Sequence, residues 1–284
     1  VILVSSLFSK ELASTSVSSK ATQRVLNGEN QSPGISVLNI NNIAYWIGKD
    51  GAYTTAGSPN GTMADYPIFT GGFIYSDGML WGAKVKGDGQ GDEVRVGGST
   101  YYHGLKAGRI ITDSEGNVLG SDDPVNNHVW RVRKDYASAD LTVDAANYYA
   151  VGTGDVTATQ IAVVKNQYEY DWYNWPAAWG APYHDVNGDG NYDPDVDVPG
   201  YPGADQTMWT IANDVPLIVD AAGDSIGYSN TAPSLYGADP IGIELQITLW
   251  GYAFGASDPL GNNIFKQAKM RYMGLPDTPD GAML

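Results

Sequence analysis

Cysteine is absent from the 284 residues of this chain. Its absence excludes a disulfide framework, a thiolate zinc site and a cysteine nucleophile. An extracellular protein of this kind needs other cross-links for its loops, and metal-bound loops can supply them. Long hydrophobic runs are missing as well, since no stretch reaches the roughly 18 apolar residues of a membrane helix. We therefore expect no membrane insertion.

Basic residues are scarce, with 16 Lys and Arg against 32 Asp and Glu and a net charge of −16. Nucleic acids and anionic membrane surfaces carry the same sign of charge, so we expect neither as a partner. The densest basic group is Arg131, Arg133 and Lys134. Strand alternation places Arg131 and Arg133 on one face, which we interpret as a solvated face.

Catalytic motifs are also lacking. The three histidines, His103, His128 and His184, lie far apart, and neither H-E-x-x-H nor G-x-S-x-G occurs. A glycosidase needs two carboxylates across a cleft, and Glu169, Asp171 and Glu244 are candidates that the sequence does not bring together. We therefore assign no catalytic and no organic cofactor-binding residues, and favour a non-enzymatic protein.

Glycine and aspartate are plentiful, with 35 Gly, and 26 of the 32 acidic residues are Asp. Repeated Asp-Gly and Asn-Gly pairs indicate tight turns. The composition predicts a mainly β fold: a sandwich-like antiparallel β body with long Gly/Asp-rich loops. The expected strand segments are 35–48, a hairpin over 71–87 around Ser76-Asp77-Gly78, 93–104, 128–136, and a half-buried strand 241–250 that pairs with 263–274.

One amphipathic helix is expected over about 157–175. Apolar residues recur there at helical spacing, at Ile161, Val164, Tyr168, Trp172 and Trp175. The start carries a capping box, formed by Thr157 and Gln160, and Pro176 marks the end.

The chain divides into two parts in this interpretation. Residues 1–34 are Ser/Thr-rich and are expected to be either an N-terminal arm or a leader remnant. The arm begins with the apolar VILVSSLF, which as an unpaired strand can seek a sheet edge in another copy of the chain. Residues 35–284 are expected to form a single mainly β domain, cut from a longer protein.

The stretch DVNGDGNYDPDVD, residues 185–197, predicts a calcium-binding loop of EF-hand type. With Asp185 as position 1, Gly190 falls at position 6, where the sharp turn is needed. Val196 occupies position 12 in place of the usual glutamate, and Pro182 and Pro194 exclude flanking helices. The predicted ligands are Asp185, Asn187, Asp189, Asn191, Asp193 and Asp197, with Asp195 as the alternative closing ligand. We expect Ca²⁺ to hold residues 180–205 against the helix and its aromatic side chains.

Aromatic side chains are concentrated just before this loop, between Tyr168 and Tyr183. Tyr170, Tyr173 and Trp179 fall off the apolar stripe of the helix and are candidates for a platform that stacks on sugar rings. Surface glycans are therefore the alternative partner.

Several phrases, among them YWIGKDG, GGFIYSDGMLWGAKV and YEYDWYNWPAAWGAPYHDVNGDGNYDPDVDVPGYPGADQTMW, together resemble a known group. This group is the N-terminal region of large uncharacterised secreted bacterial proteins that carry type IX secretion C-terminal sorting domains. The resemblance implies export and an extracellular or cell-surface location, and it implies no reaction. The sorting domain itself is not in this sequence.

These features together predict a non-enzymatic, secreted or cell-surface structural or adhesive module, stabilised by calcium and able to self-assemble. The alternative is an extracellular carbohydrate-binding or glycan-cleaving module that uses the aromatic residues of 170–183.

Overall fold

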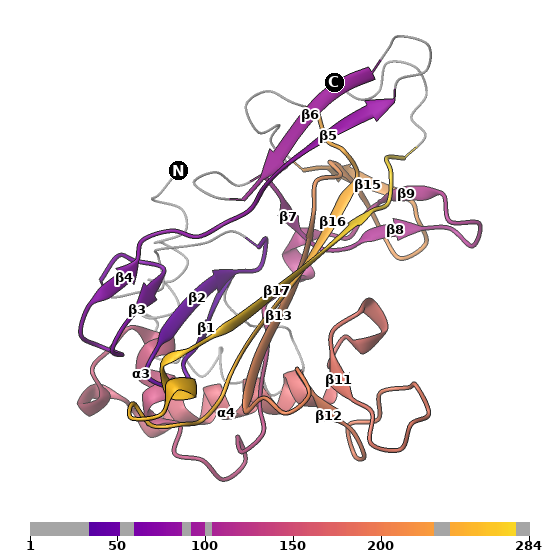
Figure 1. Ribbon diagram of the computed structural model, residues 1–284. Coiled ribbons are helices and arrows are strands. Elements are labelled where there is room, and N and C mark those ends of the chain that lie inside the picture. Colours follow the sequence, from indigo (N-terminus) through magenta and orange to yellow (C-terminus); the bar gives the residue numbers. More distant parts are fainter. Residues whose placement is uncertain (1–33, 52–59, 87–91, 100–103, 230–238, 277–284) are drawn as a thin grey trace.

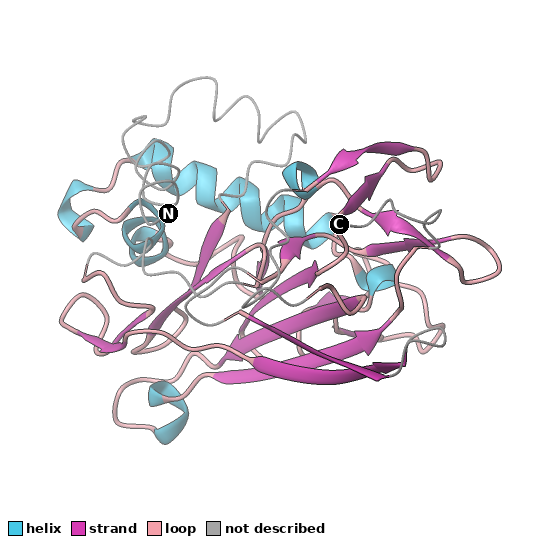
Figure 2. Ribbon diagram, turned by 90° about the horizontal axis from the view of Figure 1, so that it is seen from above, coloured by secondary structure: helices cyan, strands magenta, loops and turns pink. Residues whose placement is uncertain are grey.

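The computed structural model describes residues 34–51, 60–86, 92–99, 104–229 and 239–276. Strands predominate over helices in these ranges, and nearly all strand pairs are antiparallel, which confirms the mainly β prediction (Figures 1 and 2). The expected arm, residues 1–34, lies outside the described residues except for Gly34. Among the helices of the described ranges, none is long and apolar enough to cross a membrane.

A five-stranded antiparallel sheet forms the centre of the fold. Its strands are β7 (Lys106–Ala107), β10 (Trp130–Arg133), β13 (Gln206–Asn213), β16 (Ile243–Gly251) and β17 (Phe265–Tyr272). The order is β10-β13-β16-β17, and β7 pairs with the end of β13 that β10 leaves free. The predicted pairing of 241–250 with 263–274 is confirmed, and the two strands are connected through the 3-10 turn η5 (Pro259–Asn262).

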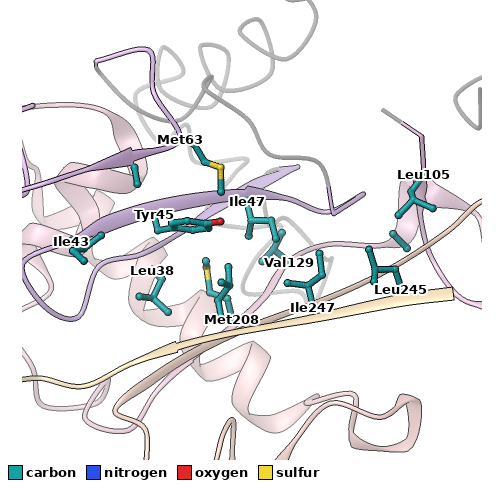
Figure 3. Close-up of a cluster of buried hydrophobic side chains, with 13 residues drawn as sticks. Leu38, Ile43, Tyr45, Ile47, Met63, Leu105, Val129, Met208, Leu245 and Ile247 are labelled. Carbon is teal, nitrogen blue, oxygen red and sulfur yellow. The ribbon is translucent and has the colours of Figure 1, made fainter. Parts of the chain in front are cut away.

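A second sheet packs on one face of the first and makes the body a sandwich. It contains β1 (Ile35–Leu38), β2 (Ala44–Gly48), β3 (Ala64–Asp65) and β4 (Gly72–Ile74). Figure 3 shows the shared core, to which the second sheet contributes Leu38, Tyr45 and Ile47 and the first contributes Leu245 and Ile247. Each fully buried aliphatic side chain stabilises this packing by roughly 1.5–3 kcal/mol.

The predicted helix exists as α4 (Ala158–Tyr173) and is entered through the predicted capping box. Thr157 accepts a bond from the Gln160 N–H at 3.2 Å, and Gln160 Oε1 accepts one from the Thr157 N–H at 2.8 Å. The helix ends at Tyr173, so Trp175 lies beyond it and is buried in the following segment. Val164 and Tyr168 are buried as expected.

A second helix, α3 (Thr142–Tyr149), is present that the sequence pattern did not predict. Its first turn has no side-chain cap, which is why no start signal was visible. Leu141, Ala145 and Tyr149 pack against Val164 and Tyr168 of α4, so the two helices form one cluster.

The remaining strands of the described ranges form three smaller sheets. The first is a two-stranded ribbon of β5 (Leu80–Lys86) and β6 (Asp92–Gly98). The second has the order β15-β14-β9-β8 and contains β8 (Ile110–Thr112), β9 (Val118–Ser121), β14 (Leu217–Val219) and β15 (Ser225–Tyr228). The third pairs β11 (Tyr183–His184) with β12 (Val198–Pro199). Three further 3-10 turns are η1 (Pro124–Asn126), η2 (Thr153–Asp155) and η3 (Ala177–Trp179).

The hairpin expected over 71–87 is wrong. β4 pairs with β3 of the second sheet, whereas β5 pairs with β6 of the ribbon. Asp77 lies between them and accepts bonds from the Tyr45 hydroxyl at 2.7 Å and from Lys266 Nζ at 2.9 Å. These distant partners fix the segment as a connection between two sheets.

The strand expected to be half-buried, 241–250, is buried on both faces along nearly all of β16. One face contacts the second sheet through Leu245 and Ile247. On the other face Gln246 donates to the carbonyl of Trp179 at 2.9 Å, so the segment after α4 covers the polar side chains.

Candidate calcium loop and aromatic layer

The acidic loop 185–197 is closed at its base by the short ladder of β11 and β12. Tyr183 faces Pro199 and His184 faces Val198 in this ladder. One residue further out, the Gly200 N–H donates to the carbonyl of Pro182 at 2.9 Å. The loop therefore starts and ends at one place, which limits the shapes it can adopt.

The first half of the loop curls around the carboxylate of Asp185. Its two oxygens accept bonds from the Gly188 N–H at 2.7 Å and from the Gly190 N–H at 2.8 Å. Gly188 and Gly190 have φ of 75° and 78°, a conformation that glycine adopts without steric cost. The sharp turn predicted at position 6 is present at Gly190.

The second half is organised by Asp197, which is only 2% exposed. Its carboxylate accepts bonds from the Val186 N–H and the Asp193 N–H, both at 2.9 Å, and so joins the two ends of the loop. Asp195 is exposed, and its N–H donates to Asp193 at 3.0 Å. The geometry favours Asp197 over Asp195 as the residue that closes the loop.

The tip of the loop is formed by Asn187, Asp189 and Asn191. Asp189 accepts bonds from the Asn191 N–H at 2.7 Å and from the Asn187 side-chain amide at 2.9 Å. These two bonds, the first above all, hold the pKa of the Asp189 carboxyl below its usual value. Across the described ranges, no group of three or more His, Asp or Glu side chains is gathered as a metal site. The acidic side chains of the loop bind its own amides.

Two aromatic side chains attach the loop to the end of α4. The Tyr192 hydroxyl donates to the carbonyl of Trp172 at 2.6 Å, and Trp172 Nε1 donates to the carbonyl of Pro194 at 3.1 Å. Burial raises the pKa of Tyr192, with smaller contributions from Asp197 and Asp193. Trp175 Nε1 donates to the carbonyl of Pro182 at 2.8 Å and fixes the base. The loop thus lies against the helix and its aromatic residues, where the sequence placed it.

The three candidate sugar-stacking residues do not share one plane. Tyr170 is nearly parallel to Trp130, with centroids 6.3 Å apart and 13° between the rings, whereas Trp179 meets Trp130 edge-on at 83°. Arg109 lies 4.2 Å above the Trp179 ring. Tyr173 is 51% exposed at the end of α4. Tyr170 and Trp179 are therefore packing partners of Trp130 rather than a flat platform.

The solvated face predicted for Arg131 and Arg133 is wrong. Arg131 is 3% exposed, and both guanidinium groups bind the buried carboxylate of Asp144 at 2.6 Å. The Tyr168 hydroxyl donates to the same carboxylate at 2.5 Å. Both faces of β10 are covered, one of them by the two helices, and strand alternation alone does not reveal that covering.

A second buried network joins α4 to β10. His128 Nε2 lies 2.9 Å from Asp171, which also accepts bonds from the Gln167 amide at 3.0 Å and the Arg131 N–H at 2.8 Å. Burial raises the pKa of Asp171, and the nearby His128 opposes this rise. The sequence showed Asp171 only as a candidate carboxylate. Asp171 lies on the same face of α4 as the buried Val164 and Tyr168, and this helical spacing could have indicated its burial.

The other candidate carboxylates and histidines are dispersed. Glu244 is buried on β16, where it accepts a bond from the Ile110 N–H at 3.1 Å and contacts Arg271 at 3.4 Å. Glu169 and His184 are exposed, and His103 lies outside the described residues. The candidate carboxylates Asp171 and Glu244 are thus bound by different partners.

Comparison with protein-family models finds no match, and comparisons with curated proteins and with solved structures find no significant match either. The resemblance to proteins exported by type IX secretion therefore remains an expectation from the sequence.

Proposed function

We propose that this chain is a non-enzymatic structural or adhesive module of the cell surface, stabilised by calcium bound in loop 185–197. The observation that carries the proposal is the combination of ligand spacing with a folded loop. Asp185 and Asp197 fix the two ends, and Gly190 supplies the turn at position 6. An acidic loop with this spacing matches a hard cation that takes six to eight oxygen ligands.

The loop carboxylates keep oxygen lone pairs that such a cation could use. An ionised carboxylate has about four lone-pair sites, and Asp185 and Asp197 each accept two hydrogen bonds from backbone amides. Each therefore keeps lone pairs for a ligand bond. Asp189 would exchange its bond with the Asn187 amide for the cation, and the cation would offset the repulsion between the loop carboxylates.

The proposed role of calcium is mechanical. Tyr192 and Trp172 connect the loop to α4, and α4 in turn packs beside β10. A stiffer loop would hold this side of the sandwich in place in a chain without disulfides. Extracellular calcium modules work at affinities down to the millimolar range, which suits the location implied by the resemblance.

The first prediction tests calcium directly. Millimolar calcium should raise the melting temperature and protect residues 185–197 from protease, because a bound ion stabilises only the folded loop. Asp189→Ala should remove both effects. Asp113→Ala is the matched control, since Asp113 also caps amides of an exposed loop, those of Glu115 and Asn117, but lies outside the acidic stretch. Identical melting and cleavage of the wild type in excess chelator and in calcium would contradict the proposal.

Glycan binding receives less support from the geometry, because Tyr170 and Trp179 pack on Trp130. A glycan array still separates the two functions. Tyr173→Ala is a better probe than Trp179→Ala, since the exposed Tyr173 ring can be removed without a cavity beside Trp130. Specific glycan binding that Tyr173→Ala abolishes would favour the carbohydrate-binding alternative.

A further inference from the structure

β17 is an exposed strand at the end of the central sheet. It follows β16 in the order β10-β13-β16-β17, and none of the described strands pairs with its outer edge (gold in Figure 1). Its residues from Gln267 to Tyr272 are exposed on both faces, with Met270 at 38% and Tyr272 at 73%. An open edge of this length can pair with a strand of another chain.

The backbone groups that face outward can be assigned from the ladder. The Met273 N–H donates to the carbonyl of Gly242 at 2.8 Å, and Tyr272 is the register partner of Ile243. Hydrogen-bonded and non-hydrogen-bonded pairs alternate in an antiparallel ladder. The N–H and C=O groups of Ala268 and Met270 therefore point away from β16.

The strand is basic in a chain of net charge −16. It carries Lys266, Lys269 and Arg271 and no acidic residue. Lys266 is bound by Asp77. Arg271 contacts Glu244 through one nitrogen at 3.4 Å with a side chain 46% exposed, and Lys269 is exposed. Lys269 and Arg271 point to one face, about 7 Å apart along the strand.

This charge pattern disfavours pairing with a second copy of β17. In a centred antiparallel pair of two β17 strands, the outward groups of Ala268 meet those of Met270, which places Lys269 opposite Lys269 of the second copy. Like charges directly opposite each other destabilise a sheet. The same side chains attract a strand of opposite charge. Charge thus selects the partner, while the outward amides of Ala268 and Met270 supply the bonds.

We propose that β17 binds an extended acidic segment of a partner protein by strand addition. The segment carries two acidic residues, two positions apart, opposite Lys269 and Arg271, and an apolar residue between them opposite Met270. This proposal goes beyond the proposed function, because it specifies the chemistry of a partner that an adhesive module would bind. The binding site on β17 does not involve the calcium loop.

The test measures binding of a labelled peptide, Ser-Glu-Val-Glu-Val-Glu-Ser, to the full chain by fluorescence anisotropy in chelator and in calcium. The same peptide with Lys in place of Glu is the charge control and should not bind. Lys269→Glu should weaken binding roughly three- to tenfold, because an attractive pair becomes repulsive. Lys165→Glu makes the same charge change on α4 and should have no effect.

The strand-addition part has its own matched pair of variants. Ala268→Pro removes an outward N–H, which an edge strand tolerates, and should abolish binding, whereas Ala268→Val keeps the N–H and should bind. A peptide N-methylated along one edge should also fail, so the result does not depend on folding of the proline variant. Binding of the N-methylated peptide, or unchanged binding by folded Ala268→Pro, would overturn strand addition. Equal binding of the Lys peptide would overturn the acidic partner. Calcium-independent binding separates this proposal from the function proposed above.

Discussion

At the scale of single residues, the buried Lys106 links the stability of the fold to pH. It is 1% exposed on β7, and its amine contacts the hydroxyl of Ser121, which is bonded to the carbonyl of Leu217 at 2.7 Å. Burial lowers the pKa of Lys106 to about 7, although Asp122 and Asp214 oppose the change. At neutral pH the folded protein therefore holds this amine near its midpoint, while an unfolded chain holds it charged.

The sign of the resulting pH dependence follows from proton counts. Between about pH 7 and 10.5 the unfolded chain binds more protons at Lys106 than the folded chain does, so this residue makes stability rise with pH. Lys106→Met should remove that rise. Urea unfolding at pH 6 and pH 9 measures the free energy of unfolding of both proteins. The difference between variant and wild type should favour the variant more at pH 6 than at pH 9, by as much as a few kcal/mol. A stability difference independent of pH would show that the lysine is not buried in this way.

Residue-level prediction succeeded where the neighbours in sequence decide the conformation. Gly190 was predicted at the turn because the loop spacing is local. Arg131 was misplaced because its partner Asp144 belongs to a helix that gave no start signal, and its burial depends on elements that cover both faces of β10. Burial of a charge depends on distant residues.

At the scale of elements, α4 shows what a local signal can determine. Its start is set by Thr157 and Gln160, which are three residues apart. Its buried face is set by the helical spacing of Val164 and Tyr168. The connection at Asp77 shows the opposite case, since its partners Tyr45 and Lys266 come from two other parts of the chain. The segment around Asp77, whose sequence resembles a hairpin turn, therefore connects two different sheets.

The capping box at the start of α4 should contribute measurably to the stability of the protein. Thr157→Ala leaves the Gln160 N–H without its side-chain acceptor and should lower the free energy of unfolding by about 1 kcal/mol. Thr157→Ser keeps the hydroxyl and should stay close to the wild type. Urea unfolding of the three proteins measures this difference. Equal losses in the Ala and Ser variants would show that the methyl group of Thr157, not the cap, stabilises the helix start.

At the scale of the whole molecule, the sandwich and the acidic loop depend on each other through α4. The central sheet packs on the second sheet through Leu245 and Ile247 on one face. On its other face Trp209 packs with Trp130 and with Trp175, which leads from α4 into the loop. The mainly β class could be predicted from composition and turn signals. The arrangement of layers could not, because it depends on which side chains meet across long distances in sequence.

The last prediction concerns assembly through the N-terminal arm. The described core begins at β1, and the carbonyl of Gly34 accepts a bond from the Lys49 N–H at 2.8 Å. A chain that starts at Gly34 should therefore fold with an unchanged melting temperature. If VILVSSLF pairs with a sheet edge of another copy, light scattering should show association that grows with concentration in the full chain and is lost in the truncated one.

A full-length variant with Ile2→Asp and Val4→Asp is the control for chain length, and it should also stay monomeric. Association of the truncated chain as before would refute the arm as the assembly element. Failure of the truncated chain to fold would instead assign residues 1–33 to the core of the domain. Binding of the acidic peptide at β17 should survive the truncation, because residues 1–33 are not part of β17.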